Sequence, residues 1–254
     1  MRDYLVFRLY GPMASWGEIA VGESRHSATY PSRSALLGLL AAALGVRRDD
    51  DAAQAALASA YRFGVKLLAA GTPLRDYHTV QSGTPPKKVV YRTRRQELAD
   101  TSRVGTLLSA REYRCDSLSL VAVEALDSAP HAVTELAQAL EHPHFPLYLG
   151  RKSCPLAAPL QARCVTAASV REALDRAEFP SMLALRRHDA PTPWPSNDER
   201  RGFRLQSVRY YWDDGMEAGM TPTMSLVRHD QPVSRRRWQF GPRREHVFLA
   251  EEGA

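Results

Sequence analysis

The sequence predicts a ferredoxin-like α+β fold of order βαββαβ, with one inserted segment and a C-terminal β-rich extension. Two observations indicate this class. Segments with strand or helix periodicity follow one another as strand, helices, strand, strand, helix, strand. Between the second and third strands lies a long basic stretch without either periodicity, and an insertion at that point should project from the sheet.

The first half of the pattern is a strand, two helices and a second strand. Alternating apolar residues predict a half-buried strand over 4–10. An apolar helix is predicted over 32–44, because a serine N-cap precedes it and Gly45 is a suitable C-cap. A shorter helix over 49–60 begins with acidic residues, which the helix dipole favours at that end. A strand over 61–69 follows, and a Gly-Thr-Pro turn ends it.

The second half is a strand over 117–126, a helix over 130–140 with one apolar stripe, and a strand over 161–167. Two further strands are predicted over 204–212 and 238–248, after a proline-rich linker. Whether they form a second sheet or extend the first is left open.

These elements divide the chain into three parts. Residues 1–81 and 111–180 are expected to form the ferredoxin-like core, residues 82–110 the insertion, and residues 181–254 the extension. The same fold builds the RNA-recognition motif, whose sheet binds RNA bases. Because a fold does not decide function, RNA binding has to be argued from residues.

The chain is basic, and its Lys and Arg residues are clustered. The 254 residues carry 34 Lys and Arg against 28 Asp and Glu, a net charge of +6. The cations gather in two clusters: Lys87, Lys88, Arg92, Arg94, Arg95, Arg103, Arg111 and Arg114, and then Arg228, Arg235, Arg236, Arg237, Arg243 and Arg244. With aromatic residues beside them, such clusters fit a polyanionic partner. A solvated surface that aids solubility explains either cluster equally well.

Several classes are excluded. No phosphate-binding loop, dinucleotide fingerprint or metal-ligand spacing is present, so we expect no cofactor and no metal. Three widely spaced cysteines predict buried thiols in a reduced, cytoplasmic chain rather than disulfides. No apolar run is long enough for a membrane span, and the N-terminal segment reads as a strand.

The segment over 11–45 holds the first candidate site. Its loop carries Trp16, Arg25 and His26, and the helix that follows opens at Arg33 and Ser34. A helix N-terminus attracts anions, so Arg33 beside it predicts a phosphate seat. Trp16 either stacks on a base or covers the helix as a core residue. The glycine in the middle of this helix predicts a close backbone approach.

The segment over 145–156 holds the second candidate site. Gly150 permits close backbone approach, Arg151, Lys152 and Ser153 offer charge and a donor to phosphate, and Tyr148 offers a stacking face. An ordinary basic turn before the last strand is the alternative.

These two segments, together with LRDYHTV at 74–80 and REYRCD at 111–116, resemble the type I-E branch of the fifth Cas protein family, the CasD family. The resemblance covers most of 1–165 and implies the ferredoxin-like fold, with the insertion as a thumb that reaches along RNA. It also implies a non-catalytic subunit of Cascade, the CRISPR RNA-guided surveillance complex, which holds the 5′ handle of the CRISPR RNA (crRNA). Its partners would be the backbone and large subunits, and target DNA indirectly. The expected RNA-binding residues are Trp16, Arg25, His26, Arg33, Ser34, Tyr77, His78, Lys87, Lys88, Arg92, Arg111, Tyr148, Gly150, Arg151, Lys152 and Ser153.

The rival hypothesis is a metal-independent endoribonuclease that processes precursor crRNA. It needs a general acid and base near a 2′-hydroxyl, and His26 and His78 are the candidates. The resemblance favours no catalysis, since relatives of this branch leave cleavage to another subunit. A basic scaffold without an RNA role is the third hypothesis.

Overall fold

The computed structural model describes residues 1–20, 22–182, 194–203, 205 and 208–250. Its strands are β1 (Arg2–Ala14), β2 (Trp16–Gly17), β3 (Ser24–Arg25), β4 (Ser27–Ala28), β5 (Tyr61–Ala69), β6 (Thr72–Gly83), β7 (Val104–Ala125), β8 (Arg163–Ala167), β9 (Arg209–Asp213), β10 (Met224–Ser234) and β11 (Gln239–Leu249). Its helices are α1 (Arg33–Leu44), α2 (Asp51–Ala60), α3 (Arg94–Leu98), α4 (Val133–Glu141), α5 (Val170–Arg176) and α6 (Asn197–Gly202), with one 3-10 turn at Thr101–Arg103. The described part therefore mixes helices and strands, and no helix in it is long and apolar enough to cross a bilayer.

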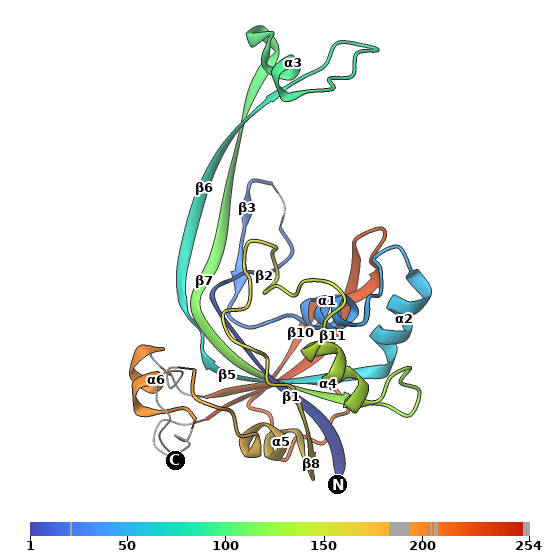
Figure 1. Cartoon of the computed structure of the whole chain (residues 1–254), viewed down its shortest axis with the longest axis vertical. Helices are drawn as coiled ribbons and strands as arrows, with labels where there is room; N and C mark the ends of the chain where they lie inside the picture. Colours follow the sequence, from blue (N-terminus) through green and yellow to red (C-terminus); the bar gives the residue numbers. More distant parts are fainter. Residues whose placement is uncertain (21, 183–193, 204, 206–207, 251–254) are drawn as a thin grey trace.

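One large sheet organises the head of the molecule (Figure 1). Its strand order is β10-β11-β9-β5-β7-β1-β8, and every neighbouring pair along this path is antiparallel. The predicted strands over 4–10, 61–69 and 117–126 coincide with β1, β5 and the second half of β7. The predicted helices coincide with α1, α2 and α4, and the strand predicted over 161–167 is β8.

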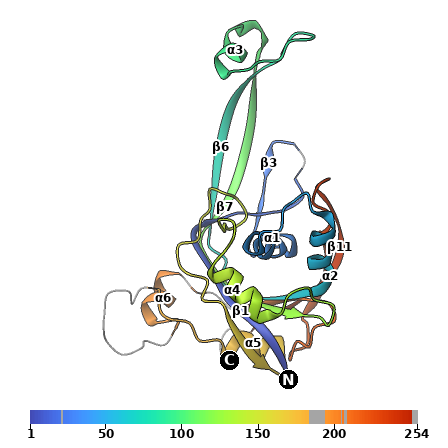
Figure 2. The ribbon, with the colours of Figure 1, turned by 45° about the vertical axis from the view of Figure 1, so that its right-hand side comes forward.

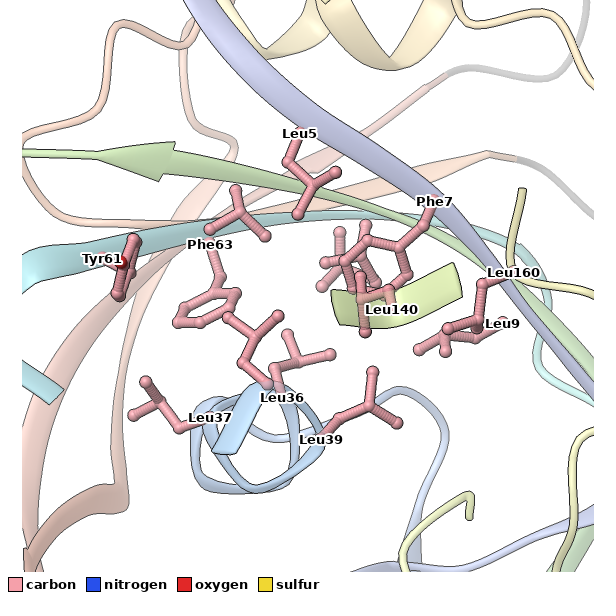
Figure 3. Close-up of a cluster of buried hydrophobic side chains, with 14 of the residues drawn as sticks. Leu5, Phe7, Leu9, Leu36, Leu37, Leu39, Tyr61, Phe63, Leu140 and Leu160 are labelled. Atoms are coloured by element: carbon pink, nitrogen blue, oxygen red, sulfur yellow. The ribbon is translucent and has the colours of Figure 1, made fainter. Parts of the chain in front are cut away.

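Strand β1 is buried on both faces, because layers cover the sheet from both sides. On one face Leu5, Phe7 and Leu9 pack with leucines of α1 and with Leu140 of α4 (Figure 3). On the other face its residues pack with α5 and with Trp212 of β9. Burying an aliphatic side chain stabilises a fold by about 1.5–3 kcal/mol. The core thus lies around β1, and residues of α1 and of the second half of β7 belong to it.

Strands β6 and β7 leave the head together and form a long two-stranded arm, hereafter the arm (residues 72–116), with α3 at its tip (Figures 1 and 2). The ladder runs without a register shift from the pair Thr72↔Cys115 to the pair Gly83↔Val104. The stretch expected to lack strand structure therefore begins and ends as strand. Its sequence shows no clear alternation because both faces of the ladder are exposed over most of its length.

The C-terminal strands extend the first sheet rather than building a second one. Strand β9 pairs with β5, and β11 and β10 follow outward. The predicted strand over 238–248 is β11. The predicted strand over 204–212 lies partly outside the described residues, and its described end is β9. Most of the predicted linker, residues 190–193, also lies outside them.

Candidate nucleic-acid interface

The N-terminus of helix α1 does not offer the phosphate seat that its sequence predicts. The Arg33 side chain is only 8% exposed and forms an ion pair with Asp213 of β9. Its Nη2 group also donates to the carbonyl oxygens of Ala58 and Tyr61, both at 2.8 Å. A guanidinium with three internal acceptors cannot reach RNA, so the expected RNA contact of Arg33 is corrected to a structural role.

The anion at this helix N-terminus comes from the protein itself. The backbone N–H of Arg33 donates to Oδ2 of Asp230 at 2.8 Å. Arg243 binds the same carboxylate at 2.6 Å, Asp213 at 2.8 Å and Glu245 at 2.5 Å. Burial alone would raise the pKa of the Asp230 carboxyl, but hydrogen bonds and charge from Arg243 hold that pKa below its usual value. The Asp230 carboxylate of this buried ionic cluster thus occupies the place at the N-terminus of α1 where the sequence predicts a phosphate.

Two other residues of the first segment are also internal. Trp16 is 4% exposed and belongs to the core, so the core alternative is correct and its expected stacking on RNA is not available. Ser34 is half-buried, and its Oγ lies 3.0 Å from the Oγ of Ser32, the N-cap of the helix. The predicted close backbone approach at Gly38 is absent, because the nearest atom to a Cβ there is a side-chain nitrogen of Arg235, at 3.4 Å.

The 148–155 loop packs against the base of the arm. A Cβ at Gly150 would overlap the carbonyl oxygen of Ser15, and its φ is +85°, so the close backbone approach that this glycine permits is made to the protein's own backbone. The guanidinium of Arg151 lies 5.0 Å from the ring centre of Tyr113 on β7. Tyr148 is half-buried and bridges to Pro155, whereas Lys152 and Ser153 are exposed.

Strand β3 brings two more candidates to the same strand β7. Its register places Arg25 beside Arg111, and both side chains are exposed. The Nδ1 atom of His26 lies 3.1 Å from Oε1 of Glu112. Burial alone would raise the pKa of Glu112, but this contact and the Ser27 N–H hold it below the usual value. The structure thus gathers Arg25, His26 and Arg111 at the base of the arm, although they are far apart in sequence.

Tyr77 and His78 lie on the arm with their side chains on opposite faces, because successive strand residues alternate. Tyr77 is 63% exposed and stands opposite Ala110. The ring of His78 contacts the carboxylate of Asp76. Two residues outside the expected RNA-binding set also lie here: Arg75 is exposed on the face of Tyr77, and Arg114, a member of the first basic cluster, donates to the Ser27 carbonyl oxygen at 3.4 Å. Strand alternation within the LRDYHTV motif was the signal that could have identified Arg75.

The arm ends in exposed cations. Lys87, Lys88 and Arg92 are exposed and form no ion pair with another described residue. Arg94 pairs with Glu97 at 2.7 Å, and Arg103 pairs with Asp100 at 3.2 Å. The tip of the arm therefore carries positive charge that no described carboxylate neutralises.

The described residues also hold no cluster of His, Cys, Asp and Glu that could bind a metal ion.

Comparisons with known proteins identify the family of this chain. The family described as CRISPR-associated protein (Cas_Cas5) matches residues 4–245. The CRISPR system Cascade subunit CasD of Escherichia coli (strain K12) is 36% identical over 182 residues, covering 68% of this chain and 76% of that protein. A chain of a solved CRISPR RNA-guided surveillance complex is 30% identical, with a TM-score of 0.64 over 98% of this chain and 90% of that one. A crystal structure of a Cas protein is 25% identical, with a TM-score of 0.60 over 98% and 95% of the two chains. The resemblance to the CasD family is confirmed, and the chain belongs to this family of CRISPR-associated proteins as a homologue of CasD.

Proposed function

We propose that the protein is a non-catalytic RNA-binding subunit of a Cascade complex, in which it holds the 5′ handle of the crRNA. The observation that carries the proposal is the exposed arm, which is basic at its tip and at its base. Two relatives support it, since one is described as a Cascade subunit and another as part of an RNA-guided surveillance complex. The protein would work in the cytoplasm, inside this assembly.

The arm would act as a thumb on a ferredoxin-like core. The order β8-β1-β7-β5 within the sheet, with α1, α2 and α4 between the strands in sequence, supports that core. The core would comprise residues 1–81 and 111–180, as the sequence predicts, with the arm strands continuing out of it and residues 181–254 extending its sheet. The arm would then present its charge well beyond the head.

The RNA contacts proposed here are the exposed members of the expected set. At the base of the arm these are Arg25, His26, Arg111, Lys152 and Ser153, and the half-buried side chains of Arg151 and Tyr148 lie beside them. Tyr77 offers an exposed ring on the arm, and Lys87, Lys88 and Arg92 offer charge at its tip. Charged donors position phosphates, and exposed rings stack on unpaired bases.

Protein neighbours would take the apolar part of the arm. Val80 and Leu107 face each other across the ladder on one face, and they are 43% and 61% exposed. Adjacent exposed aliphatic residues mark contact surfaces when they form a patch. We infer contacts with the backbone and large subunits there, and contact with target DNA only through the complex.

The placement of the two histidines supports the proposal that the protein is not catalytic. His78 faces Ser109 across the ladder, whereas His26 contacts Glu112. Ser109 and Glu112 are three residues apart on an unbroken strand, so they point to opposite faces of the arm. An acid and a base on opposite faces cannot flank one phosphodiester, which disfavours the endoribonuclease.

The test is binding of the cognate repeat RNA by the purified full chain. Arg25→Ala with Arg111→Ala should weaken binding, and the triple change Lys87→Ala, Lys88→Ala and Arg92→Ala should flatten its salt dependence by about 0.7 per lost phosphate contact. The control matched to the double change is Arg171→Ala with Arg176→Ala on α5, which also removes two positive charges but from the opposite side of the sheet. Equal affinity of all variants would refute RNA binding by the arm. Repeat cleavage that is lost in His26→Ala or His78→Ala would replace the proposal by the nuclease.

A further inference from the structure

The turn between β10 and β11 builds an aromatic and cationic surface that the proposed arm does not include. Trp238 in this turn is 58% exposed and has a left-handed φ of +57°. The guanidinium of Arg48, from the segment between α1 and α2, lies 4.8 Å from its ring centre. The Phe240 ring lies nearly perpendicular to the indole, at 5.5 Å between ring centres. The indole is thus held in place and still exposed.

Arg235 fastens this turn to helix α1. Its Nη2 group donates to the carbonyl oxygen of Ser34, and its guanidinium lies 5.9 Å from the ring centres of both Trp238 and Phe240. Burial lowers the pKa of Arg235, and the charge of Arg48 lowers it further. Arg235 is therefore committed inside the protein, and a rigid anchor reduces the entropy cost of binding at the turn.

Three cations accompany the exposed ring: Arg48 lies against it, and Arg236 and Arg237 precede it in the turn. Arg48, Arg236 and Arg237 are exposed, and none forms an ion pair with another described residue. Of the nearby carboxylates, Asp49 pairs with Arg47 at 3.3 Å and Asp50 caps helix α2, whereas Asp51, which lines a shallow pocket with Arg235, is exposed and forms no ion pair with another described residue. An exposed indole between unpaired guanidiniums complements a base with its flanking phosphates, because every base offers a π-face and every phosphate a charge. A protein surface would need matching carboxylates around an apolar pocket.

The position of the turn fits a strand that also reaches the arm. In Figure 1 the turn joining β10 and β11 lies on the same side of the sheet as β3 and the arm. Arg235 lies close enough to Tyr148 for the two side chains to interact, so the turn lies near the 148–155 loop, which packs on the base of the arm. A chain of nucleotides can therefore pass from one surface to the other.

We propose that Trp238, with Arg48, Arg236 and Arg237, forms a second contact for single-stranded nucleic acid, with one base stacked on the indole. The contact does not depend on RNA binding by the arm. Its nucleic acid is either the RNA of the complex or an unpaired DNA strand of the target, and the two are distinguished below.

Tryptophan fluorescence measures this stacking in the full chain. Trp16 and Trp212 are buried and Trp194 is half-buried, so Trp238 is the most exposed indole among the described residues. The probes are the 12-mers U12 RNA and dT12 DNA, at low salt. Quenching by a probe should occur in the wild type and disappear in Trp238→Phe. Quenching by U12 but not by dT12 assigns the contact to RNA. Equal quenching by dT12 shows that the contact also accepts single-stranded DNA.

Affinity supplies the second measurement. Trp238→Ala should weaken probe binding on the order of tenfold, whereas Trp238→Phe, which keeps a ring, should stay within about threefold of the wild type. Arg236→Ala with Arg237→Ala should also weaken it, and the control Arg200→Ala with Arg201→Ala on α6 should not. Unchanged affinity of the turn variants overturns the inference, and if the arm variants still lose binding, the proposed function stands. Turn variants that bind both probes normally but fail to join the complex overturn it in favour of a protein contact.

Discussion

Replacing Arg33 by alanine tests whether the buried ionic cluster stabilises the fold. The change removes the ion pair with Asp213 and two hydrogen bonds from Nη2 to backbone carbonyl oxygens, all in a site where the side chain is 8% exposed. Removing one partner of a buried ion pair costs about 3–5 kcal/mol, because the remaining charge stays buried. For a chain of this size each kcal/mol lowers Tm by about 2–4 °C, so Tm should fall by about 6–20 °C.

The assay compares Tm with the affinity for repeat RNA, measured at 10 °C, where the variant remains folded. Arg33→Ala should lower Tm and leave the dissociation constant within about twofold, since the side chain has no path to RNA. Arg111→Ala is the matched control: its side chain is exposed, so Tm should hold while RNA affinity falls. An unchanged Tm with weakened RNA binding in Arg33→Ala would refute the structural role and restore the phosphate seat.

Three further changes test other parts of the structure. Asp230→Asn should have a lower free energy of unfolding than the wild type at neutral pH. Because the pKa of Asp230 is depressed in the folded protein, this difference in free energy should be full above about pH 5 and should shrink as the pH falls through the folded pKa. Urea unfolding from pH 3 to 7 measures it, and a difference that stays constant into acid contradicts the assignment. Gly150→Ala should lower Tm, because its φ is +85° and its Cβ would overlap Ser15, and an unchanged Tm would mean that the loop relaxes freely. Replacing residues 84–103 by a two-residue Asn-Gly turn should keep Tm within a few degrees but prevent stable assembly with crRNA, and size-exclusion of the reconstituted complex decides whether the tip is a passive loop.

The sequence could predict those elements that bury one face or carry a local cap. Helix α1 begins at its serine N-cap and ends at Gly45 in the left-handed conformation, and both signals lie within the helix ends. Strands β1 and β5 could be predicted because their sequences are rich in apolar residues, which the structure buries. The arm gave no such signal, because a ladder exposed on both faces needs no alternation, and its pairing is visible only in three dimensions.

The phosphate seat failed for a physical reason. A helix N-terminus attracts any anion, and the local sequence does not show whether that anion is a phosphate or a carboxylate of the protein itself. Here it is Asp230, which is 197 residues away from Arg33 along the chain. By contrast, the close approach at Gly150 was predictable, since a basic turn that packs on another backbone needs a residue without Cβ at that point.

The ionic cluster and the Trp238 surface share one hairpin, so their separate roles can be tested against each other. Strand β11 is held to β9 by five paired residues, and Arg235 binds the Ser34 carbonyl oxygen independently of Arg33. Losing Arg33 should therefore lower the free energy of unfolding without releasing the turn that carries Trp238. Arg33→Ala and Trp238→Ala should then act oppositely: the first lowers Tm at constant affinity, and the second lowers affinity at constant Tm. The opposite result would be a folded Arg33→Ala variant whose fluorescence the probes no longer quench. In that case the ionic cluster would also position the indole, because the β10–β11 hairpin would need the Arg33 charge to stay packed against α1.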